Sequence, residues 1–167
     1  MWVYISLGIV WVGLLIPVIR ERQTWIACAH GGTGLFFTSL FLSLGLDKTG
    51  YLADILWLKI IGFILLIPAI ILFIAAMVSI ARGSLVKTGI SGIVRHPMYL
   101  GTALAAFALM LVFQSILSIV LGIPAIVFLW IAGTLEDTHN IERFGDSYRK
   151  YMSSVPRWNI FKGLQKQ

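Results

Sequence analysis

The chain has 167 residues, of which 59% are hydrophobic and 12% are charged, with a formal net charge of +6. Soluble domains carry about 25% charged residues, and a small domain cannot bury this much apolar surface in one core. The composition therefore excludes a soluble globular protein, and the aromatic content of 13% excludes a disordered one. We interpret the chain as an integral membrane protein.

Apolar stretches separated by short polar breaks predict an all-α, polytopic bundle of about five transmembrane helices. A helix needs about 20 apolar residues to cross a bilayer. In chain order the predicted spans are 2–19, 25–46, 55–81, 98–113 and 116–133. The first span lacks the basic segment and the cleavage site of a signal peptide, so we expect it to be retained. The fourth is short and only Gln114-Ser115 separates it from the fifth, which predicts a tight helical hairpin.

Basic residues lie mainly on one side of these spans. Of the 13 lysines and arginines, all but Lys48 and Lys59 fall in loops or tails on that side. The positive-inside rule predicts that this side is cytoplasmic, with the N-terminus outside and the C-terminus in the cytoplasm. Basic residues beside a membrane meet anionic lipid, which accounts for the net charge without nucleic acid. We expect one membrane domain over residues 1–167, with three spans in 1–81.

Polar residues concentrate in two segments on the predicted cytoplasmic side, where function is expected. The first segment, 82–99, contains His96-Pro97 immediately before the fourth span. Proline suits the first position of a helix, with His96 available as its cap. The free N–H groups of a helix start bind a carboxylate or a phosphate, and Gly101 leaves room for a ligand or another backbone. The alternative is a plain boundary between loop and helix.

The second polar segment, 134–157, opens with Glu136-Asp137. This pair suits either a bound cationic group or the acidic start of an amphipathic helix. Glu136 and His139 have the Glu-x-x-His spacing of di-iron bundles, but the sequence has no second such pair, so no metal site is expected. A cytoplasmic amphipathic helix on the membrane surface is predicted by the helical spacing of four apolar residues, Ile141, Phe144, Tyr148 and Tyr151.

Motifs in both segments resemble a known family, the integral-membrane methyltransferases. That family includes isoprenylcysteine carboxyl methyltransferase and the phospholipid N-methyltransferases. The resemblance begins with the string RHPMYLG at residues 95–101, which a hydrophobic hairpin and an acidic pair follow. It continues through FGDSY at 144–148, Tyr151, and VPR at 155–157. It covers about residues 83–161, so we expect the cofactor-binding loop, hairpin and tail in 82–161.

The resemblance implies a pocket for S-adenosylmethionine and methyl transfer to a lipophilic acceptor, which is a prenylcysteine carboxylate, a lipid amine or a thiol. The implied cofactor-binding residues are Gly83, Ser84, Leu85, Val86, Ser91, His96, Pro97, Met98, Tyr99, Leu100, Gly101, Glu136 and Asp137. The candidates for a catalytic role are Tyr99, Tyr148 and Arg157. Membrane lipids are expected partners, and neither a metal nor a nucleic acid is expected.

The chain departs from the family pattern at three positions. Ser91 stands where the family often has an aromatic residue, and Asp137 stands where the acidic pair is usually Glu-Glu. Ala132 replaces an arginine that holds the substrate in the prenylcysteine enzymes. This replacement argues against an acceptor carboxylate held in that manner. Two alternatives are an NADPH-dependent membrane sterol or steroid reductase and a non-catalytic membrane protein that keeps the fold.

Overall fold

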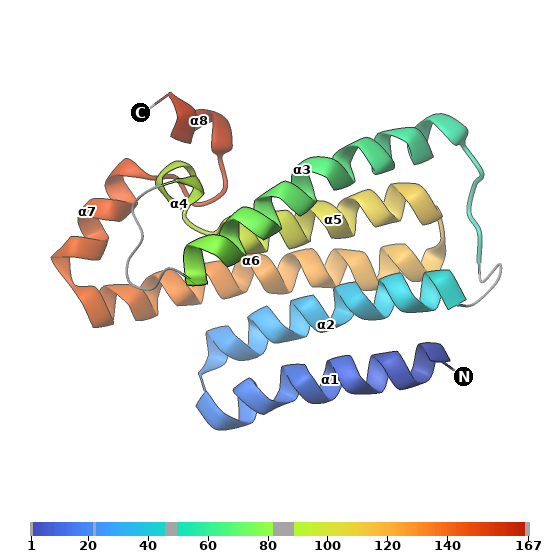
Figure 1. Cartoon of the computed structure of the whole chain (residues 1–167), viewed down its shortest axis with the longest axis horizontal. Helices are drawn as coiled ribbons and strands as arrows, with labels where there is room; N and C mark the ends of the chain where they lie inside the picture. The colour runs from blue at the N-terminus through green and yellow to red at the C-terminus, as the bar shows by residue number, and fades with distance from the viewer. Residues whose placement is uncertain (1, 22, 46–49, 82–88, 166–167) are drawn as a thin grey trace.

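The computed structural model describes residues 2–21, 23–45, 50–81 and 89–165, and 87% of them are helical. No strand occurs within these ranges, which confirms an all-α membrane bundle. The helices are α1 (Trp2–Glu21), α2 (Thr24–Gly45), α3 (Leu56–Ala81), α4 (Ile90–Ile93), α5 (Pro97–Phe113), α6 (Ile116–Phe144), α7 (Asp146–Ser154) and α8 (Ile160–Leu164), as Figure 1 shows.

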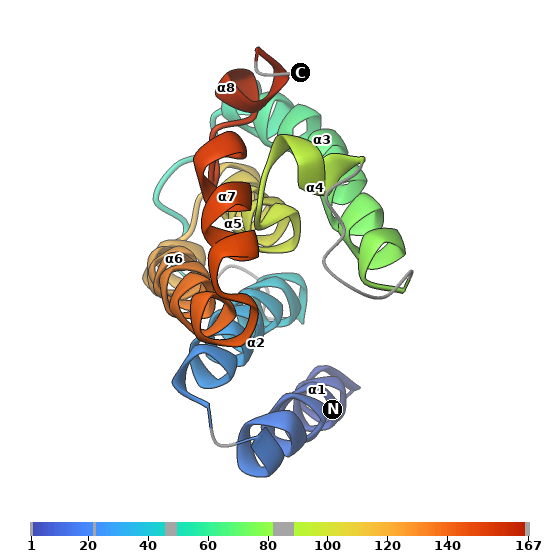
Figure 2. The same ribbon diagram turned by 90° about the vertical axis from the view of Figure 1, so that its left-hand side faces the viewer.

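The long helices α1, α2, α3, α5 and α6 run along the bundle and alternate in direction, so the chain termini lie at opposite ends (Figure 1). Four of them are long and apolar enough to cross a membrane, whereas α5 has 17 residues. At 1.5 Å per residue α5 reaches about 25 Å, slightly less than a hydrocarbon core of about 30 Å. The short helices α4, α7 and α8 gather at one end (Figure 2). We call residues 89–96 and 145–165 the polar cap.

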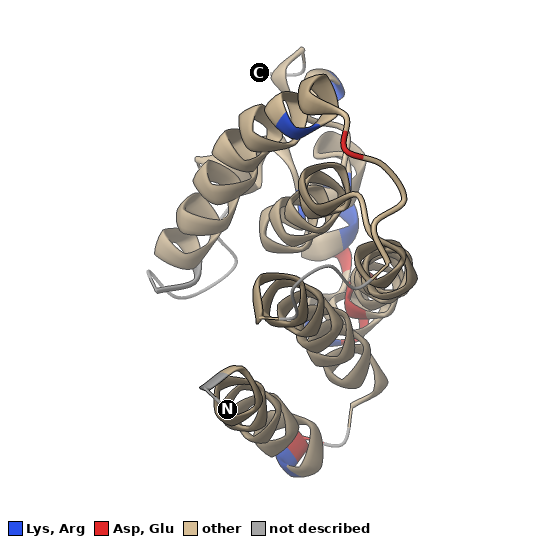
Figure 3. Ribbon diagram, turned by 90° about the vertical axis from the view of Figure 1, so that its right-hand side faces the viewer, with Lys and Arg blue, Asp and Glu red and all other residues tan. Residues whose placement is uncertain are grey.

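Small residues pack the interior of the bundle, and large apolar residues cover its outside. Ala76, Ala108 and Ala125 are at most 1% exposed. Isoleucine, leucine and phenylalanine side chains are instead exposed along α1, α3 and α6. Charged residues colour only short stretches of the ribbon in Figure 3. Small residues at helix contacts and large apolar residues outside are typical of helices packed in lipid.

Glycines allow two helix pairs to approach closely. A Cβ atom at Gly32 would lie 2.9 Å from the Ala125 carbonyl oxygen, which places α2 against α6. A Cβ atom at Gly101 would lie 2.9 Å from the Ala69 carbonyl oxygen, which places α5 against α3. The space expected at Gly101 is therefore taken by the backbone of a neighbouring helix. This contact fixes the first turn of α5.

We expect Gly101→Ala to lower the melting temperature of the detergent-purified protein. The new methyl group overlaps the backbone of α3, and overpacking costs about 1–3 kcal/mol. Gly8→Ala on α1 is the matched control, because a Cβ atom there meets nothing within 4 Å. Both replacements gain the same helix propensity, about 1 kcal/mol. Equal melting temperatures for the two variants would contradict the close α3–α5 contact.

The turn between α5 and α6 forms at Gln114-Ser115, as the sequence predicts. Gln114 ends α5 in the left-handed conformation, with φ of 47°. Ser115 then caps α6 through reciprocal hydrogen bonds with Ser118. The Gln114 side chain also bonds both the N–H and the carbonyl of Ile55 at 2.9 Å. These bonds hold the hairpin beside the start of α3.

The end of α6 differs from the prediction. This helix continues past residue 133 to Phe144, and the expected surface helix is interrupted at Gly145, where φ is 55°. Glu136 and Asp137 therefore lie inside α6, and their interpretation as an acidic helix start is wrong. The amphipathic helix is the shorter α7, which buries Tyr148.

Candidate functional site

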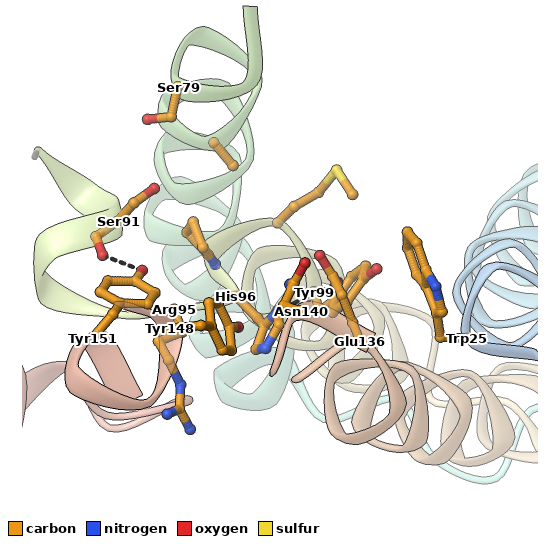
Figure 4. Close-up of a pocket in the computed structure, with 13 residues that line it drawn as sticks. Trp25, Ser79, Ser91, Arg95, His96, Tyr99, Glu136, Asn140, Tyr148 and Tyr151 are labelled. Carbon is orange, nitrogen blue, oxygen red and sulfur yellow. Dashed lines mark hydrogen bonds and ion pairs between the residues drawn. The ribbon is translucent and has the colours of Figure 1, made fainter. Parts of the chain in front are cut away.

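A cavity of about 400 Å³ lies between the polar cap and the long helices (Figure 4). Its volume is within the range of about 300–1,000 Å³ that is usual for ligand pockets. Both halves of the chain contribute to its walls. The lining residues are Trp25, Ala76, Ser79, Ser91, Arg95, His96, Pro97, Met98, Tyr99, Glu136, Asn140, Tyr148 and Tyr151.

The start of α5 is fixed by pairing with the C-terminal segment. The N–H of Arg95 donates to the Pro156 carbonyl at 3.0 Å, and the N–H of His96 donates to the Arg157 carbonyl at 3.5 Å. A residue before proline avoids the helical conformation, so His96 stays non-helical and Pro97 begins the helix. The expected cap is not formed by the His96 side chain, which makes no capping hydrogen bond. Its ring points to α6 instead.

Asp137 is the centre of a buried network that joins α6 to the polar cap. This residue is 2% exposed. Its Oδ1 atom accepts from Tyr148 Oη at 2.7 Å and lies 2.9 Å from His96 Nε2. Its Oδ2 atom accepts from Arg157 Nε at 2.8 Å and lies 3.3 Å from Arg95 Nη2. Buried charges need partners of this kind, and here they hold three separate segments together.

Glu136 faces the cavity, whereas its neighbour Asp137 does not line it. The Glu136 side chain is 25% exposed, and its Oε2 atom lies 3.4 Å from His96 Nδ1. Figure 4 shows it beside Tyr99, with Trp25 opposite on α2. Among the described lining residues Glu136 is the only acid. It can therefore accept hydrogen bonds from a ligand and balance a ligand's positive charge.

His96 lies between the two carboxylates. Burial by itself would lower its pKa, but hydrogen bonds to Asp137 and Glu136, together with their charges, outweigh burial and raise the pKa above its ordinary value. Each ring nitrogen faces a carboxylate oxygen. Only the protonated ring donates from both nitrogens, so the imidazolium form fits this position.

Residues 70–147 match the model of the phospholipid methyltransferase family. This segment belongs to that family. It includes the Arg95–Tyr99 region, Glu136 and Asp137, so it covers the centre of the site. The family match and the apolar helices support a multi-pass membrane protein of methyltransferase type. No curated protein and no solved structure matches the chain significantly.

The expected cofactor-binding residues fall into three groups. Those that line the cavity are Ser91, His96, Pro97, Met98, Tyr99 and Glu136. Those that do not line it are Leu100, which lines a second cavity, Gly101, which packs on α3, and Asp137. Those that lie outside the described residues are Gly83, Ser84, Leu85 and Val86. The segment that matches the family, residues 70–147, thus supplies the start of α5 and the inner face of α6 to the cavity.

The three candidates for a catalytic role have different surroundings. Tyr99 and Tyr148 line the cavity, whereas Arg157 lines the second cavity and bonds Asp137 and Thr134. Burial and then the hydrogen bond to Asp137 raise the pKa of Tyr148. Its hydroxyl therefore remains protonated near neutral pH and is a poor proton acceptor.

Several wall residues were not among the expected cofactor-binding or catalytic residues, although Arg95 and Tyr151 belong to the motifs that carry the family resemblance; they are Trp25, Ala76, Ser79, Arg95, Asn140 and Tyr151. Asn140 follows Glu136 by four residues and so shares its helix face, a spacing that identifies it. Tyr151 follows Tyr148 by three residues on α7, where its hydroxyl donates to the Ser91 carbonyl at 2.5 Å. Nothing local identifies Trp25, because an aromatic residue at the end of a span has the same pattern whether it faces lipid or a cavity.

We expect the stability contributed by His96 to fall as the pH rises. A group whose pKa is higher in the folded state favours folding when protonated. Its contribution is complete below the unfolded pKa of about 6.5 and is lost as the pH passes through the raised value. The melting temperature of the wild-type protein should therefore drop across this window, whereas His96→Gln should lack that drop. Parallel pH curves for the two proteins would refute this role.

Proposed function

We propose that this protein transfers a methyl group from S-adenosylmethionine to a lipophilic acceptor at the cytoplasmic membrane face. One observation carries the proposal. The segment that matches the family supplies Glu136 and His96 to a cavity of cofactor size, and it places an acidic group directly beside a helix start, with Glu136 Oε2 3.4 Å from His96 Nδ1. Because residues 1–81 and 82–161 both line this cavity, we propose that they work as one domain.

The polar groups around the cavity suit this cofactor. Glu136 supplies a carboxylate that can accept from an ammonium group or from ribose hydroxyls. The N–H groups of Met98 and Tyr99 lie in the first turn of α5, where helical N–H groups lack partners inside the helix and attract a carboxylate. The Leu100 N–H donates to the His96 carbonyl and is therefore not free to bind a ligand.

The aromatic walls suit the remaining part of the cofactor. Trp25 lies on one side of the cavity, and Tyr148 and Tyr151 lie toward the other (Figure 4). Aromatic side chains offer flat faces on which an adenine ring can stack. When bound, the cofactor supplies a methyl group that is already activated by the sulfonium charge. The protein's own work is therefore to align the acceptor and to exclude water.

We propose a lipid amine as the acceptor. The family name points to phospholipids, and the structure offers no arginine at the position that holds a carboxylate in prenylcysteine enzymes. Ala132 at that position is 0% exposed and packs in a core cluster with Ala29, Tyr99 and Leu129. The outer faces of α3 and α6 carry exposed apolar side chains, as helices in contact with lipid do, and we propose that the lipophilic acceptor enters from the bilayer.

We also propose that the polar cap faces the cytoplasm. Arg20 lies in the last turn of α1, and Arg95 and Arg143 lie where α5 begins and α6 ends. These positions all belong to the end of the bundle that carries the polar cap, whereas Lys59 lies in the first turn of α3 at the other end (Figure 1). The charge distribution therefore agrees with the positive-inside rule.

Calorimetric titration of the detergent-purified protein with S-adenosylhomocysteine tests the proposed activity, with NADPH titrated in parallel. We expect saturable binding of S-adenosylhomocysteine alone. Binding of NADPH alone would place the protein among reductases, and binding of neither by a folded sample would contradict a cofactor site. A positive result should be followed by methyl-transfer assays on phospholipids with a primary amine and on matched lipids without one.

A further inference from the structure

A second cavity, of about 730 Å³, lies between the C-terminal segment and helices α3, α5 and α6. It shares no lining residue with the first cavity. Its helical wall is apolar and consists of Leu72, Leu100, Leu104 and Trp130. Leu72 lies nine residues before the end of α3 at Ala81, a depth of roughly 13 Å at the helical rise. The cavity thus extends from the polar cap down the side of the bundle.

The end of this cavity at the polar cap is positively charged. Arg157 and Lys162 line it, and no described acidic residue does. Asp137 partly balances Arg157 from inside the protein, whereas Lys162 has no ion pair among the described residues. Trp158 also lines this cavity, and its ring packs edge-on against Trp130.

Helix α8 carries exposed apolar side chains beside this charged end. Its Phe161 side chain is 82% exposed and Leu164 is 54% exposed. Exposed apolar residues next to basic ones are typical of a segment lying in the membrane interface. Gly163 packs against the Ile93 carbonyl with no room for a Cβ atom, which fixes α8 on the polar cap. The cavity therefore has an apolar part along the long helices and a cationic part beside α8.

We propose that this cavity binds one anionic phospholipid, which is not methylated. The phosphate lies near Arg157 and Lys162, and an acyl chain follows the apolar helical wall. The lipid joins the C-terminal segment to α3 and α5. Because Arg157 also bonds Asp137, this lipid strengthens the network that holds the polar cap. The proposal does not depend on methyl transfer in the first cavity.

Native mass spectrometry of the full-length, delipidated protein in detergent tests this site. The probes are phosphatidylglycerol and phosphatidylcholine with the same acyl chains. We expect a one-to-one complex that forms at lower concentration with phosphatidylglycerol. Removing one basic charge near a membrane surface weakens binding of anionic lipid by about fivefold, so Lys162→Gln should show a loss of that size.

Lys150→Gln is the matched control, because Lys150 is an exposed lysine of α7 that does not line this cavity. It should bind phosphatidylglycerol as the wild-type protein does. Equal binding of the two lipids, or equal losses in Lys162→Gln and Lys150→Gln, would overturn the proposal. Titration of the same samples with S-adenosylhomocysteine reports on the first cavity separately. Failure of lipid binding is therefore distinguishable from failure of the proposed methyltransferase activity.

Discussion

The Asp137→Asn variant is expected to lose a large part of its thermal stability together with its cofactor binding. Asp137 is buried and contacts four side chains, two at each carboxylate oxygen. Breaking a buried ion pair by removing one partner costs about 3–5 kcal/mol. Native stabilities are about 5–15 kcal/mol, so a loss of this size is a large part of the total.

The shape of asparagine is close to that of aspartate, so the loss arises from charge and hydrogen bonding rather than from packing. An amide has one acceptor oxygen and one donor nitrogen. The amide nitrogen, which is a donor, then faces either His96 and Tyr148 or the two arginines, Arg95 and Arg157. Because these side chains are the donors to Asp137 in the wild-type protein, donor groups meet at that side of the amide. The guanidinium groups also lose their buried counter-charge. The polar cap would separate from α6, and the walls of the first cavity would separate with it.

Thermal unfolding in detergent measures this effect, with Asp146→Asn as the matched control. Asp146 begins α7 and is fully exposed, and its nearest basic partner is Arg149 at 3.8 Å. Exposed pairs of this kind contribute little, so the control should melt close to the wild-type protein. Melting of Asp137→Asn at the control temperature would show that the network does not hold the polar cap.

The membrane spans could be predicted from the sequence because the hydrocarbon core of a bilayer disfavours polar and charged residues. A stretch of about 20 apolar residues that must satisfy its own backbone becomes a helix, and Gln114-Ser115 marks the turn between two of them. The end of α6 could not be predicted in the same way. The sequence becomes less hydrophobic after residue 133, but a helix can continue through polar residues. Helix α6 continues to Phe144, and Gly145 caps its end. A glycine with positive φ is a common helix end, so that signal was present in the sequence.

The candidate site could be predicted in its motifs but not in its geometry. Glu136 and Asp137 are adjacent and chemically alike, so the sequence does not tell which faces the cavity and which is buried. Their difference arises from partners far along the chain, since His96 lies 41 residues from Asp137. The same distant contact explains why the His96 ring does not cap α5. Trp25 enters the site only because α2 packs against α6.

The Glu136→Gln variant is expected to lose cofactor binding while it keeps its fold. A hydrogen bond to a charged group contributes about 1.5–3 kcal/mol, which corresponds to roughly 10- to 150-fold weaker binding of S-adenosylhomocysteine. Glutamine has the same length as glutamate and remains a hydrogen-bond acceptor, and Glu136 does not hold the arginines of the network. The melting temperature without ligand should therefore stay close to that of the wild-type protein.

Glu142→Gln on the same helix is the control for charge, since Glu142 is exposed and does not line the cavity. Calorimetry and thermal unfolding of both variants separate the two acidic neighbours by their roles. Replacing the Asp137 carboxylate by an amide lowers stability and cofactor binding together, because that residue holds the walls of the first cavity. Replacing the Glu136 carboxylate by an amide lowers cofactor binding alone, because that residue faces the ligand. Binding by Glu136→Gln with the affinity of the Glu142→Gln control would show that the cofactor does not contact this carboxylate, and the first cavity would need another occupant.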